Sequence, residues 1–125
     1  MIHLLIVAAG GACGAALRHL VGLAALRMLG PNFPWGTLTV NILGSFIMGV
    51  FIELLALKLN GSAELRLLIA TGLLGGFTTF SAFSLDVVLL YERGALGTAA
   101  LYVLGSVVLA IGALFAGLIV TRSLV

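Results

Sequence analysis

Apolar residues fill four long stretches of this 125-residue chain, and polar residues gather in the short segments between them. The apolar stretches cover residues 4–29, 37–57, 67–91 and 96–120. Each is close to the ~20 residues that an α-helix needs to cross the hydrocarbon core of a bilayer. The first stretch resumes after Arg18-His19, so we expect a retained membrane helix and not a cleaved signal peptide. The pattern predicts one all-α integral membrane domain, residues 1–125, with four transmembrane helices.

Composition supports a surface that faces lipid. The chain is 62% hydrophobic and only 8% charged, whereas a soluble domain carries about a quarter charged residues. Six basic and four acidic side chains could not solvate a globule of this size. The net charge of +2 comes from scattered basic residues that form no basic stripe, so a nucleic-acid partner is not expected. The lone Cys13 lies among small residues and excludes an internal disulfide.

Basic residues are divided almost evenly between the two sides of the predicted membrane domain. Four crossings place the N-terminus, the second connection and the C-terminus on one side, which carries Lys58, Arg66 and Arg122. The opposite side carries Arg27 and Arg93, with Arg18 as a further candidate. Because asymmetry of Lys and Arg sets orientation, this near-balance predicts dual topology. Four thin helices can hardly enclose a pore, so we expect an antiparallel homodimer.

Small residues recur four apart in every stretch, a spacing that lets helix backbones approach closely in lipid. The pairs are Gly10 and Gly14, Ser45 and Gly49, Gly72 and Gly76, and Ala113 and Gly117. They predict close helix packing, either within one subunit or between subunits.

The second stretch carries Thr37, Asn41 and Ser45 on one helical face, because they are four residues apart. Polar side chains inside a membrane are costly, so those that occur need a reason. Asn41 could join helices through hydrogen bonds, or its amide donors could line a pore, and the residues alone favour neither. Tyr102 and Ser106 share a face of the fourth helix, where they either extend a polar track or bond to a neighbouring backbone.

The third stretch contains poor helix formers in the middle of the predicted span. Gly75-Gly76 is followed by the β-branched pair Thr78-Thr79. Non-helical backbone at membrane depth is tolerated only where it is buried in protein or lines a cavity. We therefore expect a mid-membrane break, which would free backbone carbonyls able to bind a cation. The alternative is a continuous helix whose glycines allow close packing.

Two aromatic rings follow the predicted break at helical spacing. Phe80 and Phe83 lie three residues apart, and the edge of an aromatic ring carries partial positive charge. Two such rings are commonly core or lipid contacts, but here the hydroxyl groups of Thr79, Ser81 and Ser84 are interleaved with them. Hydrogen-bond donors beside ring edges suit a small anion, so this segment is a candidate anion pathway.

Charged residues are nearly absent from the predicted spans. Glu53 and Asp86 lie towards helix ends, and Arg18 is the one charge well inside a stretch. Arg18 would either face an aqueous vestibule and draw anions, or extend to the membrane interface. The only histidines, His3 and His19, lie towards the ends of the first stretch. No nucleophile–base pair can be assembled from these residues, so an enzyme is not expected.

Three segments together resemble the Fluc/CrcB family of fluoride ion channels. They are residues 10–18 (GGACGAALR), 36–44 (GTLTVNILG) and 75–84 (GGFTTFSAFS), in this order on a four-helix chain. The resemblance covers nearly the whole length and implies an antiparallel, dual-topology homodimer with two fluoride pathways. It also implies passive export of fluoride across the inner membrane of a bacterium.

The resemblance further implies particular roles for residues of the candidate pathway. A central structural sodium ion would be held by the main-chain carbonyls of Gly75 and Thr78 from each subunit. Asn41 would line the pore, and Tyr102 and Ser106 would belong to a polar track on the fourth helix. Phe80 and Phe83 would turn their ring edges to the anion.

The chain departs from the family at a few positions. Many relatives have Thr in place of Ala82 and Glu in place of Asp86, and some have a hydroxyl in place of Ala110. These changes would alter the hydration of the polar pathway or its conduction rate.

Two other classes of membrane protein are rivals to this interpretation. A four-helix multidrug or cation antiporter needs a central acid on its first helix, and residues 4–29 contain none. A non-transporting assembly subunit would leave the Asn41 and phenylalanine cluster without a role.

Overall fold

Seven helical segments make up the chain in a computed structural model that describes residues 1–125. They are α1 (Ile2–Leu29), α2 (Trp35–Leu57), α3 (Ala63–Leu65), the π-helix η1 (Arg66–Leu74), α4 (Gly75–Phe77), α5 (Ser81–Glu92) and α6 (Leu96–Leu124). The segments α3 to α5 follow one another as one interrupted span, so four helical spans are long and apolar enough to cross a membrane. The predicted all-α architecture with four spans is confirmed.

The helical spans are longer than the apolar stretches, because polar residues at their ends find local hydrogen bonds. At the start of α3, the N–H of Leu65 donates to the Ser62 hydroxyl (3.3 Å), which caps the helix. Near the end of α6, the hydroxyls of Thr121 and Ser123 donate to carbonyls one turn earlier (2.8 and 3.0 Å). Hydropathy alone misses such turns, so the helices of the third and fourth spans extend beyond the apolar stretches 67–91 and 96–120.

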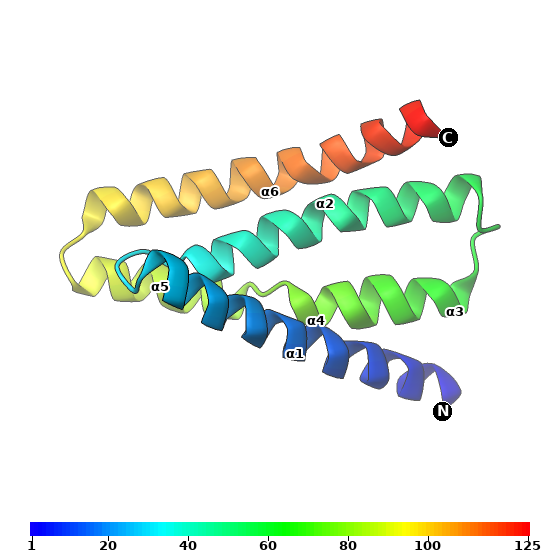
Figure 1. Cartoon of the computed structure of the whole chain (residues 1–125), viewed down its shortest axis with the longest axis horizontal. Coiled ribbons are helices and arrows are strands. Elements are labelled where there is room, and N and C mark those ends of the chain that lie inside the picture. The colour runs from blue at the N-terminus through cyan, green and yellow to red at the C-terminus, as the bar shows by residue number, and fades with distance from the viewer.

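The connections lie at the two ends of the bundle as four crossings require (Figure 1). The N-terminus, the turn between α2 and α3, and the C-terminus lie at one end. The connections from α1 to α2 and from α5 to α6 lie at the other. At the first end, the Arg122 Nε lies 2.9 Å from a carboxylate oxygen of Glu53, whose side chain is only 12% exposed. This ion pair accounts for the acid that the sequence places near the end of α2.

Glycines let the backbones of neighbouring helices touch. A Cβ atom on Gly76 would lie 2.6 Å from the carbonyl oxygen of Gly11, and one on Gly14 would overlap the carbonyl of Leu73. A Cβ on Gly117 of α6 would likewise collide with α2. The close packing predicted from small residues is thus found within the chain, between α1 and the third span and between α2 and α6.

The third span changes partners where it is interrupted. Its first half, η1 and α4, packs along α1, whereas α5 packs mainly on α6. In Figure 1 the chain between α4 and α5 is drawn out of helical shape. The deepest side chains are Val40 of α2 and Tyr102 of α6, each 1% exposed. Only 17 of the 125 residues are buried, so most of the apolar surface faces outward.

Candidate functional site

The interruption of the third span is the centre of the candidate site. Thr78 has an extended backbone (φ −85°, ψ 160°), and regular helix resumes at Ser81. The N–H of Thr78 still donates to the carbonyl of Leu74 (3.0 Å), and so does the Thr78 hydroxyl (3.0 Å). The N–H of Thr79 turns away from the helix. The predicted mid-span break is confirmed.

Asn41 of α2 holds the peptide that leaves the helix. Its Nδ2 donates to the carbonyl of Thr79 (3.0 Å), and its Oδ1 accepts the N–H of Thr79 (2.8 Å). Gly44, three residues later on α2, has no side chain and so leaves room for the methyl group of Thr78. The first of the two roles left open for Asn41, a bond between helices, is therefore present. The second hydrogen on the Asn41 amide nitrogen has no hydrogen-bond partner within the chain.

The hydroxyls interleaved with the phenylalanines make short-range contacts around the break. The Thr79 hydroxyl accepts the N–H of Ala82 (3.1 Å) and lies 3.3 Å from the Ser81 hydroxyl. The Ser84 hydroxyl donates to the carbonyl of Phe80 (2.9 Å). The Thr79 hydroxyl thereby satisfies one N–H group of the first turn of α5. Ser81 and Ser84 do not line the cavity that Asn41, Thr79, Phe80, Phe83 and Ser106 share.

A cavity of about 480 Å³ brings most of the predicted residues together. Those that line it are Asn41, Gly75, Thr78, Thr79, Phe80, Phe83 and Ser106. The Phe80 and Phe83 ring centroids are 5.5 Å apart, and Phe80 is 78% exposed whereas Phe83 is 9% exposed. The Ser106 hydroxyl is buried without a hydrogen-bond partner. An unpaired buried hydroxyl is rare and needs an explanation, and this one belongs to a residue that lines the cavity.

Tyr102 lies beside this cavity and not in its wall. Its hydroxyl donates to a carboxylate oxygen of Asp86 (2.9 Å), and its ring lies 5.1 Å from the ring of Phe83. The Phe33 ring meets that of Tyr102 edge to face, with centroids 5.4 Å apart and an interplanar angle of 85°. Sequence reasoning missed Phe33 because it lies in a connection between two prolines, where hydrophobic periodicity carries no signal.

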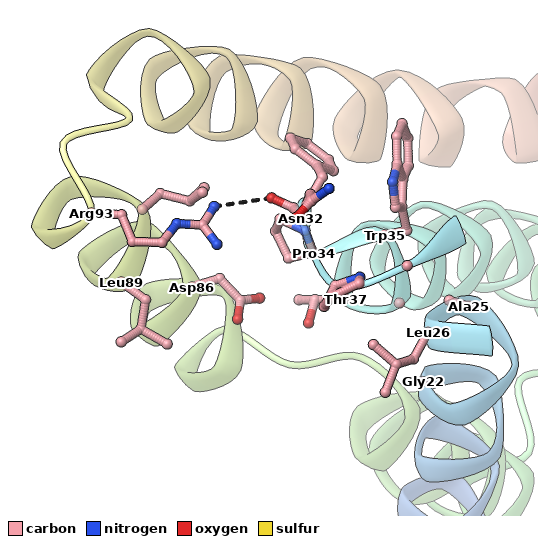
Figure 2. A pocket seen from close by; sticks show the side chains of 15 residues that line it. Gly22, Ala25, Leu26, Asn32, Pro34, Trp35, Thr37, Asp86, Leu89 and Arg93 are labelled. Atoms are coloured by element: carbon pink, nitrogen blue, oxygen red, sulfur yellow. Dashed lines mark hydrogen bonds between the residues drawn. The ribbon is translucent and has the colours of Figure 1, made fainter. Parts of the chain in front are cut away.

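A second hollow, of about 310 Å³, lies at the end of the bundle that carries the α1–α2 and α5–α6 connections. Figure 2 shows the Asp86 carboxylate and the Thr37 hydroxyl facing each other across it. On the same side, the Arg93 guanidinium donates to the carbonyl of Asn32 (3.0 Å), which ties the α1–α2 connection to the end of α5. Tyr102 therefore stands between this polar hollow and the phenylalanine-lined cavity.

Arg18 reaches the break from the opposite side to Asn41. Its Nε donates to the carbonyl of Gly76 (3.1 Å), and the side chain is partly buried. It also lines a third cavity, of about 300 Å³, together with His19, Thr37 and Thr79. Of the two positions left open for Arg18, an aqueous vestibule or the membrane interface, neither included this partner, which is a backbone carbonyl of the interrupted helix.

The oxygen atoms around the break are of the kind that bind a hard monovalent cation. The carbonyl oxygens of Gly75 and Thr78 accept no hydrogen bond from the chain, and both residues line the 480 Å³ cavity. No group of three His, Cys, Asp or Glu side chains is present that could hold a transition metal. Neutral carbonyl oxygens freed by an unwound helix are ligands that suit sodium. Two such ligands from one chain leave the coordination incomplete.

Comparisons with known proteins identify the family. A sequence model described as "CrcB-like protein, Camphor Resistance (CrcB)" matches residues 5–118. Proteins of Agrobacterium fabrum and Chelativorans sp. are 59% and 60% identical over 124 residues, which is 99% of each chain. A protein of Rhizobium etli is 58% identical over 125 residues, the full length of both chains. All three are named "Fluoride-specific ion channel FluC". With four apolar spans and this similarity along its length, the chain is a multi-pass membrane protein that belongs to the CrcB family.

Proposed function

We propose that this protein is a fluoride-selective ion channel that conducts passively. The carrying observation is the 480 Å³ cavity, where the unpartnered Ser106 hydroxyl, the Asn41 amide and two phenylalanine rings meet beside a broken helix. The names of its relatives, which share more than half of its residues, support the choice of anion. Conduction is a physical transfer, so the proposal includes no catalysed reaction.

The chemistry of the cavity suits an anion that must be released as well as bound. Donor hydrogens on Asn41 and Ser106 can replace part of the hydration shell of fluoride, and ring edges of Phe80 and Phe83 offer diffuse positive charge. No basic side chain lines this cavity. Weak, multiple contacts of this kind favour conduction, because an ion held by a fixed buried charge would leave slowly.

The working unit in this proposal is an antiparallel homodimer of dual topology with two pores. A single chain buries only 17 residues and leaves Phe80 78% exposed, so one copy does not enclose its own cavity. Basic residues occur at both ends of the bundle, as insertion in both orientations requires. A second copy would cover the open side of the cavity, and an antiparallel arrangement gives each face of the membrane the same pore mouths.

The proposal assigns a structural sodium ion to the centre of that dimer. The unbonded carbonyls of Gly75 and Thr78 would hold it, and a second copy would supply the same pair. When bound, the ion adds positive charge beside the anion pathway. In the cell, the channel would let fluoride leave the cytoplasm across the inner membrane of a bacterium.

A four-helix multidrug or cation antiporter remains the alternative to test against. Such exporters couple transport to protons through a buried acid. No carboxylate lines the central cavity, and Asp86, three residues after Phe83, accepts a hydrogen bond from Tyr102. We therefore favour the channel.

Ion efflux from liposomes that contain only this protein tests the proposal. Fluoride and chloride electrodes are read in parallel, with a potassium ionophore to carry the compensating charge. We expect rapid fluoride release without chloride release, and loss of most of it in Phe80→Ile. Phe115→Ile is the matched control, because it changes a ring of α6 that lies outside the cavity. Folded, dimeric protein that releases no fluoride would overturn the channel proposal.

A further inference from the structure

We infer that Arg18 is a positioning residue that fixes the broken helix through Gly76, and not a group that draws anions by its charge. Its Nε lies 3.1 Å from the Gly76 carbonyl oxygen, although 58 residues separate the two in sequence. A charge inside a membrane span is costly, so it is retained only where a specific partner offsets that cost. The Gly76 carbonyl is such a partner.

The packing of α1 explains why an arginine at this position reaches the break. Gly11 and Gly14 place the α1 backbone directly against Gly76 and Leu73, with no side chain between. Arg18 follows Gly14 by one helical turn and Gly11 by two, so it leaves α1 on the same face. It therefore arrives at the end of the first half of the third span.

The hydrogen bond lies where an interrupted helix most needs one. The last carbonyls of a helix lack intrahelical partners and carry the negative end of the helix dipole. Arg18 satisfies the carbonyl of Gly76, and Asn41 satisfies both polar groups of Thr79. The backbone is thus fastened on both sides of Thr78. The carbonyls of Gly75 and Thr78 stay free beside the cavity.

The geometry of the guanidinium makes this role specific to arginine. Its planar group presents Nε–H in a fixed direction while the terminal nitrogens remain available to the 300 Å³ cavity that also contains Thr37 and Thr79. A lysine carries the same charge but no such directed donor. Arg18→Lys therefore keeps the attraction of the charge for anions and removes the hydrogen bond that positions the break.

Hydrogen–deuterium exchange in lipid nanodiscs tests the inference without any measurement of transport. Wild type, Arg18→Gln and Arg18→Lys are compared over residues 77–83, with residues 96–120 as the internal reference. Loss of a hydrogen bond to a charged donor should speed local exchange about tenfold or more in Arg18→Gln. Arg27→Gln, at the exposed end of α1, is the matched control and should change nothing. Unchanged exchange over residues 77–83 in Arg18→Gln would overturn the inference.

Unitary fluoride currents in planar bilayers test the consequence for conduction, which rests on the proposed function. Poor folding lowers the number of channels and leaves the current of each one unchanged, whereas a displaced break lowers the unitary current. We expect a lower unitary current in both Arg18 variants, with the deficit kept at about 1 M salt. A wild-type current in Arg18→Lys, together with a deficit in Arg18→Gln that disappears at high salt, would show attraction by charge and refute positioning. If the wild type carries no fluoride current but Arg18→Gln still shows faster exchange over residues 77–83, the channel proposal is refuted and the positioning role of Arg18 stands.

Discussion

Asn41 and Thr79 exchange two hydrogen bonds across the break, at 3.0 and 2.8 Å, in the way that two paired peptide groups do. One comes from the amide nitrogen of Asn41 and the other goes to its amide oxygen. The side chain of α2 therefore replaces the helical partners that Thr79 loses. The same amide keeps one N–H for the cavity, so Asn41 combines support of the break with a place on the proposed pathway.

Asn41→Asp should disable this arrangement. The aspartate still accepts the N–H of Thr79, but its second oxygen would face the Thr79 carbonyl without a hydrogen between them. A buried acceptor left unsatisfied costs about 1–3 kcal/mol, and more when charged. We expect a lower melting temperature in detergent and a fall in fluoride efflux of about 100-fold. Asn60→Asp, in the exposed turn after α2, should leave both unchanged. Wild-type efflux from Asn41→Asp would contradict the role of the donor.

Ser106→Ala should separate stability from conduction. Ser106 is 6% exposed and its buried hydroxyl has no partner in the chain, so removal of the hydroxyl relieves a cost of about 1 kcal/mol. We expect an equal or higher melting temperature and a fall in fluoride efflux of about tenfold. Ser123→Ala, which removes an exposed hydroxyl bonded within α6, is the control for loss of a serine. Unchanged efflux from Ser106→Ala would show that fluoride does not use this donor.

Tyr102 and Asp86 should behave as a coupled pair. Tyr102→Phe removes the donor of their hydrogen bond and keeps the ring that packs on Phe83. Asp86→Ala removes the acceptor. Each single change should lower the free energy of unfolding by about 1–2 kcal/mol, and the double change by less than the sum, because both remove the same bond. Thermal denaturation of the four proteins in one detergent measures the coupling. Strict additivity would mean that the bond contributes nothing.

Gly14→Ala should disturb the packing of α1 on the third span. An added Cβ would overlap the Leu73 carbonyl, which is backbone and cannot rotate away. Overpacking of this kind costs about 1–3 kcal/mol and sometimes more. We expect a lower melting temperature and faster exchange at the break. Gly97→Ala is the matched control, since a Cβ there meets nothing within 4 Å and alanine is the better helix former. A variant as stable as Gly97→Ala would contradict the close contact.

Several local features follow from the sequence because a single segment decides them. Four apolar stretches of near-membrane length predict four spans, and the Gly75-Gly76 and Thr78-Thr79 pairs predict where the third one fails. Helix propensity and hydropathy act over a few residues at a time. The break and the order of the helices could therefore be predicted without knowledge of any contact between them.

The partners of the polar groups depend on the tertiary structure. From the sequence, Asn41 could join helices or line a pore, and Arg18 could face a vestibule or the membrane interface. The packing of α1 and α2 against the third span brings Arg18 to Gly76 and Asn41 to Thr79. The Ser106 hydroxyl has no partner in the chain, whereas the hydroxyls of Ser81 and Ser84 find local ones, at the Thr79 hydroxyl and the Phe80 carbonyl. Hydropathy and periodicity determine that a polar group lies within the membrane. Which atom satisfies it is decided by helices that are far apart in sequence, because a hydrogen bond needs two groups within about 3 Å of each other.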